Sequence, residues 1–139
     1  MKAVTYQGHK NMEVREVNDP TIEESTDAII KITASGICGS DLHLYHQGDL
    51  FMDPGFVIGH EPMGIVEEVG KEVKTLKKGD RVVIPFNIGC GDCFYCNNEM
   101  ESQCDNSNSS PASWKMDNGG LFGFGGMHGN HWGGQAEYL

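Results

Sequence analysis

Four cysteines give this sequence its clearest chemical signal. They follow the pattern C-x2-C-x2-C-x7-C within fifteen residues, at Cys90, Cys93, Cys96 and Cys104. Thiolates so close in sequence can converge on one ion from a single loop, and a tetrahedral zinc ion takes four such ligands. Glycines at 89 and 91 let the backbone bend around the ion. A site filled entirely by protein ligands is closed, so its predicted role is structural, contributing to folding.

Iron is the main alternative metal for this loop. Rubredoxin-type sites use two separated C-x2-C knuckles, and bacterial ferredoxin runs place a proline after the last cysteine, whereas Asp105 follows Cys104 here. Four free thiols in one loop would oxidise readily, so an unmetallated loop is disfavoured. The pattern therefore favours a structural zinc ion.

Composition restricts the class of protein and its partners. A length of 139 residues suits one domain with a modest core, and nineteen glycines favour turn-rich β structure. The net charge is −10, and a zinc ion held by four thiolates would add −2, so nucleic acid and anionic membranes are excluded as partners. The sequence has no signal peptide or membrane-length apolar run. The cytoplasm is therefore the default location, and in that reducing compartment the crowded cysteines favour metal binding over disulfides.

Local patterns predict a succession of short strands. Strands are expected at 2–6, 12–17, 28–34, 63–69 and 81–85, a tight turn that opens a short helix within 35–45, and a strand beginning at 135. The Asn-, Ser- and Gly-rich stretch 105–134 predicts a long irregular surface loop. Many short strands and few helices indicate a mainly β, barrel-like domain.

A second group of candidate ligands is sparser. It comprises Cys38, Gly39, Ser40, Asp41 and His43, followed by Gly59-His60-Glu61. A lone cysteine is usually a small buried apolar residue, and a lone histidine a satisfied polar one, so these residues alone are weak evidence. Together with the cysteine loop, these residues become strong evidence.

Taken together, four segments resemble the zinc-dependent medium-chain alcohol dehydrogenases. They are 34–43, 59–66, 78–82 and the cysteine loop, in the order and spacing of that family and covering essentially the whole chain. The stretch 104–138 is similar to formaldehyde-dehydrogenase-like members. The resemblance implies a GroES-like irregular β-barrel with short helices over residues 1–139, with a zinc-binding lobe at about 87–105.

The same resemblance implies roles for individual residues. Cys38 and His60 match ligands of a catalytic zinc ion. Glu61 matches the adjacent acid that can enter the coordination sphere of that ion. Ser40 matches the hydroxyl that binds the substrate oxygen, and His43 the end of a proton relay through the cofactor ribose. Asp41 matches the carboxylate that orients the histidine ligand, and Gly39 a position near the cofactor pyrophosphate.

The implied activity is oxidation of a small alcohol by hydride transfer to NAD+ or NADP+ in a longer, homo-oligomeric enzyme. The third protein ligand of the catalytic zinc and a Rossmann domain would lie beyond residue 139, because the glycine-rich stretch 119–126 is not a G-x-G-x-x-G motif. We therefore expect residues 1–139 alone to be inactive, with a filled structural site beside a weak or empty catalytic one.

Two other functions compete with this interpretation. A non-catalytic, zinc-stabilised β-barrel binding module would need no second ligand set, and a zinc-free quinone-reductase-like enzyme would need no cysteine loop. The Cys38/His60 pair argues against the binding module, and the four cysteines argue against the quinone-reductase-like enzyme. The H-x2-H pair of His128 and His131 is interpreted as two solvent-exposed loop histidines, because ordering a flexible loop for two ligands costs too much entropy.

Overall fold

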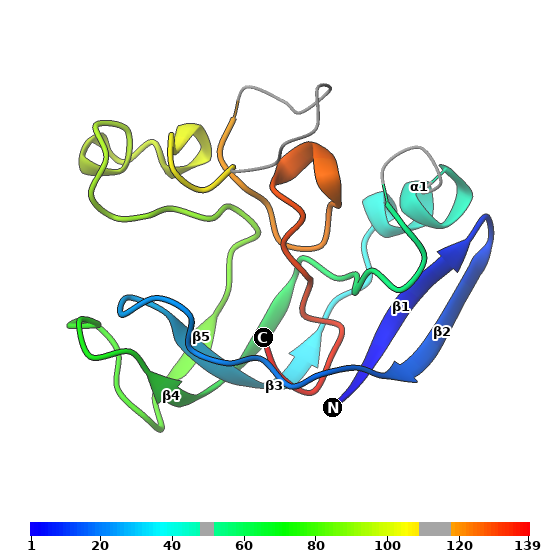
Figure 1. Ribbon diagram of the computed structural model, residues 1–139, viewed down its shortest axis with the longest axis horizontal. Coiled ribbons are helices and arrows are strands. Elements are labelled where there is room, and N and C mark those ends of the chain that lie inside the picture. The colour runs from blue at the N-terminus through cyan, green and yellow to red at the C-terminus, as the bar shows by residue number, and fades with distance from the viewer. Residues whose placement is uncertain (48–51, 109–117) are drawn as a thin grey trace.

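The computed structural model describes residues 1–47, 52–108 and 118–139, which form two antiparallel sheets (Figure 1). The first pairs β1 (Lys2–Gly8) with β2 (Asn11–Glu16). The second has the order β3-β4-β5, with β3 at Ala28–Ser35, β4 at Pro62–Val69 and β5 at Arg81–Val83. Five of the predicted strands are present, with boundaries that shift by one or two residues, but the strand expected from residue 135 forms only isolated bridges, at Ala136 and Tyr138.

The hairpin forms where the sequence predicts it. His9 and Lys10 make the turn, and Lys10 takes a left-handed conformation with φ of 55°. Alternation along β1 places Ala3 and Thr5 in the interior, together with Tyr6. The Lys10 N–H donates to the carbonyl of Tyr45 at 2.9 Å, which ties the hairpin turn to the helix behind it.

The helix α1 (Gly39–Gln47) begins immediately after Cys38. The Asp41 carboxylate accepts the Cys38 N–H at 2.8 Å, as the acidic residue of a capping box does. Leu44 faces inward and joins the main apolar cluster, whose buried members are Tyr6, Leu44, Met52, Phe56 and Ile58. The core therefore lies between α1 and the β1–β2 hairpin, directly below the segment that supplies Cys38.

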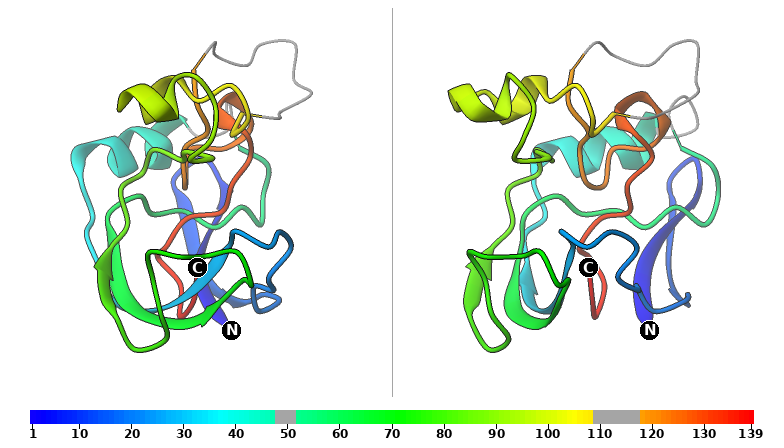
Figure 2. Two further views of the ribbon diagram at one scale, coloured as in Figure 1. Left: turned by 90° about the vertical axis from the view of Figure 1, so that its left-hand side faces the viewer. Right: turned by 60° about the vertical axis from the view of Figure 1, so that its left-hand side comes forward.

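Segments without regular structure join the two sheets. Val57 bridges to Thr5, and a stretch near residue 136 bridges to both sheets through the pairs Ala3–Ala136 and Lys31–Tyr138. Figure 2 shows this last stretch running between the sheets. The described residues are mainly β, as predicted, but their strands do not close into one continuous barrel.

The cysteine loop forms a lobe that projects from the sheets (Figures 1 and 2). Two single-turn 3₁₀ helices, η2 (Cys96–Asn98) and η3 (Glu101–Gln103), are its regular elements. A third, η4 (Gly126–His128), lies in the following segment. None of the helices in the described ranges is long and apolar enough to cross a membrane.

The prediction of a surface loop over 105–134 is wrong for its described second half. Gly119, Gly120 and Leu121 are buried, and the stretch pairs with its surroundings through Asn87–Leu121 and Phe122–His131. Backbone without side chains can pack closely in an interior, so glycine content alone did not distinguish this packed segment from a surface loop. Residues 109–117 lie outside the described residues.

Candidate metal centres

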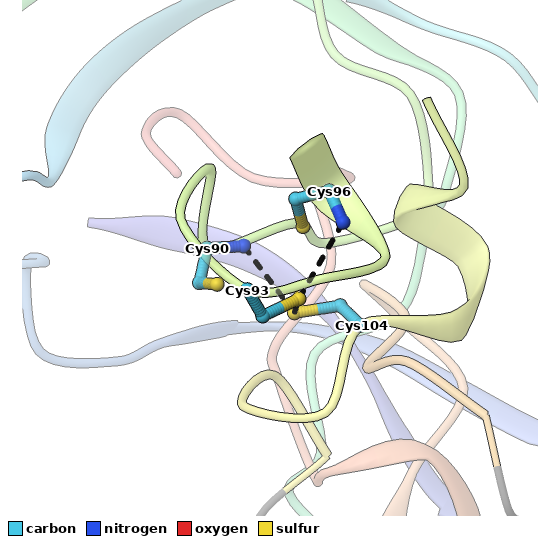
Figure 3. A group of neighbouring side chains, drawn as sticks. All are labelled: Cys90, Cys93, Cys96 and Cys104. Carbon is cyan, nitrogen blue, oxygen red and sulfur yellow. Dashed lines mark hydrogen bonds between the residues drawn. The ribbon is translucent and has the colours of Figure 1, made fainter. Parts of the chain in front are cut away.

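The four cysteines of the lobe converge on one point (Figure 3). Their sulfur atoms all lie within 4.8 Å of one another, and those of Cys93 and Cys104 are 4.0 Å apart. Zinc–sulfur bonds of about 2.3 Å in a tetrahedron require sulfur–sulfur separations of about 3.8 Å. The side chains therefore fit a four-coordinate zinc ion with only small movements. We call this group the cysteine centre.

Hydrogen bonds to the sulfur atoms stabilise this arrangement. The backbone N–H of Cys90 donates to the Cys104 sulfur at 3.4 Å, and that of Cys96 to the Cys93 sulfur at 3.5 Å. The Asn106 side chain donates to the Cys90 sulfur at 3.4 Å. Donors around thiolates are the usual means by which a protein offsets the negative charge of such a site.

Three of the thiols differ in acidity. Burial raises the pKa of Cys104, but hydrogen bonds, first that of the Ser107 hydroxyl, outweigh this and lower the pKa to about 6. Burial raises the pKa of Cys96 to about 12. A backbone hydrogen bond from Asp92 lowers the pKa of Cys90. Cys96 would keep its proton at neutral pH until a cation replaces it, so metal binding here must release protons.

A second group lies where the β3–α1 connection meets the segment before β4. The Cys38 sulfur is 2.8 Å from the Ser40 hydroxyl and 3.0 Å from Nε2 of His60, and the Ser40 hydroxyl is 3.0 Å from the same Nε2. Three polar atoms, from residues 38, 40 and 60, thus form a compact triangle. A sulfur and an imidazole nitrogen are suitable ligands for one zinc ion, and tetrahedral coordination would move these two atoms apart to about 3.5 Å. We call Cys38, Ser40 and His60 the triangle.

Asp41 fixes the histidine of the triangle from behind. Its Oδ1 lies 3.2 Å from Nδ1 of His60, at an angle outside hydrogen-bond geometry, and both side chains are about 95% buried. Its other oxygen accepts the Cys38 N–H. A carboxylate beside Nδ1 leaves Nε2 directed at Cys38, and Asp41 also lies within metal-binding range of the pair.

Aromatic side chains cover the His60 ring. Phe124 lies 4.7 Å and Phe86 6.2 Å from the His60 ring centroid, and the two phenylalanine rings are 6.1 Å apart. Phe86 is about 42% exposed, so this wall borders solvent. An apolar wall beside polar ligands is typical of a small-molecule site.

The remaining predicted site residues lie outside the triangle. His43 and Gly39 are exposed on α1. Glu61 is exposed as well, and its carboxylate lies against Gly36, where a Cβ atom would collide with it. Among the described residues, Glu61 does not join the Cys38, Asp41 and His60 group.

Several contacts escaped sequence reasoning. His128 and His131 are half-buried rather than solvent-exposed, and each ring has a hydrogen-bond partner. Nδ1 of His128 lies 3.2 Å from the Asn118 amide, and Nε2 of His131 lies 2.7 Å from the Ser107 carbonyl. No sequence periodicity indicates these pairs or the Phe86–Phe124 wall, because each depends on loop segments meeting in space.

The family comparison decides the classification. Residues 24–139 match the family described as the alcohol dehydrogenase GroES-like domain. The chain belongs to this family. A member from Bacillus subtilis, the zinc-type alcohol dehydrogenase-like protein AdhB, is 60% identical over 139 residues. Its alignment covers all of this chain and 35% of AdhB.

Other members of the family extend the comparison. The formaldehyde dismutase of Pseudomonas putida is 37% identical over 144 residues, covering 99% of this chain and 34% of that protein. Alcohol dehydrogenase TADH from Thermus sp. ATN1 superposes with a TM-score of 0.86 at 42% identity, covering 100% of this chain and 36% of TADH. The chain thus spans about a third of the length of these relatives. The predicted family and the mainly β fold are confirmed.

Proposed function

We propose that residues 1–139 form the zinc-binding catalytic domain of an alcohol dehydrogenase that oxidises a small alcohol or aldehyde with NAD+ or NADP+. The lobe at about 87–105 is its structural zinc site, and the rest of the enzyme supplies a Rossmann domain. The triangle supports this proposal most directly, because it brings the Cys38 sulfur and Nε2 of His60, from positions 22 residues apart, within 3.0 Å of each other. Membership of the alcohol dehydrogenase family supports the reaction type.

Cys38 and His60 would hold the catalytic zinc ion, which when bound supplies Lewis acidity toward an alcohol oxygen. Asp41 keeps Nε2 of His60 directed at the ligand position. The Phe86–Phe124 wall restricts water at one side of this position. Glu61, whose exposed carboxylate lies against Gly36, is a further candidate ligand only if its side chain rotates.

Ser40 is the residue placed to accept the alcohol proton. Its hydroxyl lies within 3.0 Å of both proposed ligand atoms, so a substrate oxygen at the metal would be within its reach. His43 is three residues further along α1 and exposed, which suits a group that passes the proton to solvent. Gly39, also exposed and without a side chain, leaves room for a cofactor pyrophosphate.

A chimaera tests the proposal. Residues 1–139 would replace the matching third of TADH, and purified protein would be assayed for NAD(P)H formation from primary alcohols. We expect activity that Cys38→Ser and His60→Ala abolish, and that Ser40→Ala lowers about 100-fold. Val14→Ala, an exposed position on β2, is the control and should leave the rate unchanged.

One result would contradict the proposal. A folded chimaera with bound zinc and no alcohol oxidation would instead favour a non-catalytic zinc-stabilised binding module.

A further inference from the structure

Gln135 lies between the two segments that carry the ligand atoms of the triangle. One segment is the link from β3 to Cys38, at residues 36–38, and the other is the stretch 57–60 that ends at His60. Both ligands lie beyond the paired part of β3 and β4, whose last partners are Ser35 and Pro62. The sheet therefore brings the two segments near each other, and further contacts must set the final distance between the ligand atoms.

The link from β3 to Cys38 has little packing support of its own. Gly36 has no side chain, and the Ile37 side chain is 75% exposed. The Gly36 N–H donates to the Glu61 carbonyl at 3.0 Å, which extends the pairing of β3 with β4 by one hydrogen bond. This bond holds the peptide group before Gly36 but not the peptide group after it, which leads to Cys38.

The side chain of Gln135 supplies the contact that holds this second peptide group. Its amide nitrogen Nε2 donates to the Gly36 carbonyl at 3.1 Å. A carbonyl oxygen can only accept a hydrogen bond, so the NH2 group of the amide, and not its oxygen, must face Gly36. The position therefore requires a side chain that carries a donor at this length.

The main chain of Gln135 holds the other ligand-bearing segment. Its N–H donates to the Ile58 carbonyl at 3.0 Å, two residues before His60. Its Cβ and Cγ lie over Gly59, where an added Cβ atom would come within 2.9 and 2.5 Å of them. Its carbonyl accepts the Val4 N–H at 2.8 Å, which anchors it to β1. One anchored residue thus contacts each segment two positions before the ligand.

We propose that Gln135 is a positioning residue, which sets the separation of the Cys38 sulfur and Nε2 of His60 by holding the Gly36 carbonyl. Without the amide donor, the link to Cys38 is free to move while Ile58 and His60 keep their places. This inference deepens the proposed function and rests on it in taking Cys38 and His60 as metal ligands. Its first test needs neither a metal ion nor catalysis.

The first measurement follows the distance between the two ligands in the metal-free chain by NMR. Because the Cys38 sulfur and Nε2 of His60 are 3.0 Å apart, protons on the neighbouring carbons should give a nuclear Overhauser cross-peak. Gln135→Met keeps the side-chain length without a donor, so most of the cross-peak intensity should be lost. Gln7→Met is the matched control, because it removes an amide that donates to the Thr5 hydroxyl at 2.8 Å on β1. It should leave the cross-peak unchanged.

Two further variants test whether the hydrogen bond itself is responsible. Gln135→Glu keeps the shape of the side chain but places an acceptor against the Gly36 carbonyl, so it should lose as much intensity as Gln135→Met. Gln135→Lys presents a donor at a similar reach and should retain most of the intensity. A side chain that only filled space would not separate these two variants. If Gln135→Met does not fold, the comparison of Gln135→Glu with Gln135→Lys decides.

The second measurement is the cobalt affinity of the triangle in the TADH chimaera, with zinc at the cysteine centre. Gln135→Met should weaken cobalt binding about fivefold, as expected for the loss of one hydrogen bond. It should also shift the visible absorption bands of the bound cobalt ion, because these depend on ligand geometry. Gln7→Met should do neither, and neither variant should change the zinc affinity of the cysteine centre.

The outcomes separate this inference from the proposed function. Wild-type cross-peak intensity in Gln135→Met would overturn the inference even if the chimaera oxidises alcohols, as would equal losses in Gln135→Glu and Gln135→Lys. Absence of the cross-peak from the wild-type chain, or unchanged cobalt affinity in Gln135→Met, would overturn it as well. An inactive chimaera together with the expected cross-peak pattern would contradict the proposed function and support the placement of Cys38 by Gln135.

Discussion

The two candidate metal-ligating groups of this chain are assembled in opposite ways. The cysteine centre draws four ligands from fifteen consecutive residues, whereas the triangle joins Cys38 to His60 across 22 positions and two elements. The first group lies within a single loop, while the second lies beside the buried Asp41 carboxylate and close to the core that contains Leu44 of α1. A local motif can therefore organise its surroundings, but the triangle is itself organised by the fold.

The largest expected contrast comes from removing one sulfur from each group. Structural zinc sites contribute about 12 kcal/mol, so one ligand of four is worth about 3 kcal/mol. Cys96→Ser should thus lower the zinc affinity of the cysteine centre at least about 100-fold, whereas Cys38→Ser should leave it unchanged. Zinc competition titrations on both variants measure this. Equal losses would mean that the two groups share one ion.

Two glycines with positive φ test the same contrast in the backbone. Gly59 precedes His60 with φ of 105°, and a Cβ there would meet Gln135 N at 2.5 Å, while Gly91 in the lobe has φ of 76° and open space. Gly59→Ala should cost about 2–3 kcal/mol, from strain and collision together, and Gly91→Ala about 1 kcal/mol from strain alone. Urea unfolding of the zinc-loaded proteins gives both values. Similar losses would mean that crowding near His60 is unimportant.

The buried carboxylate separates orientation from coordination. Asp41→Asn keeps the shape of the side chain but weakens its hold on Nδ1 of His60, so metal affinity at the triangle should fall about tenfold. Asp92→Asn, an exposed position in the lobe, serves as the matched control. Cobalt binding to the TADH chimaera, followed by absorption, reports the affinity. A loss confined to the cysteine centre would contradict the assignment of Asp41 to His60.

The smallest effect concerns pH and His128. Burial lowers the pKa of His128 from 6.5, so the folded chain favours the neutral ring whose Nδ1 faces the Asn118 amide. Stability from this group is therefore present above about pH 6.5 and is lost as the pH falls through the lowered folded pKa. His128→Gln should reduce this loss of stability at low pH. The change in the free energy of unfolding should be less than about 1 kcal/mol, because the ring is partly exposed. Thermal unfolding from pH 7.5 to 5 measures it, with His9→Gln as the control.

Sequence reasoning succeeded where information is local. The cysteine spacing, the β1–β2 turn and the β-branched run of β3 each specify their structure within a few residues. The triangle required a family resemblance, because nothing in the sequence alone brings Cys38 to His60. The packing of Phe124, the contacts of Gln135 and the buried course of residues 119–121 were not predictable, since glycine-rich composition is shared by surface loops and by backbone packed against backbone.

The stretch around residues 135–139 bears on how this chain is synthesised. Gln135 hydrogen-bonds with Val4 of β1, Glu137 with both Lys2 of β1 and Ile32 of β3, and Leu139 with Ile30 of β3. A nascent chain emerging from the ribosome must therefore wait for this stretch before its two sheets can be joined. Until then the faces they share remain open to chaperones and to aggregation. Contacts spanning more than a hundred residues also predict slow folding for a domain of this size.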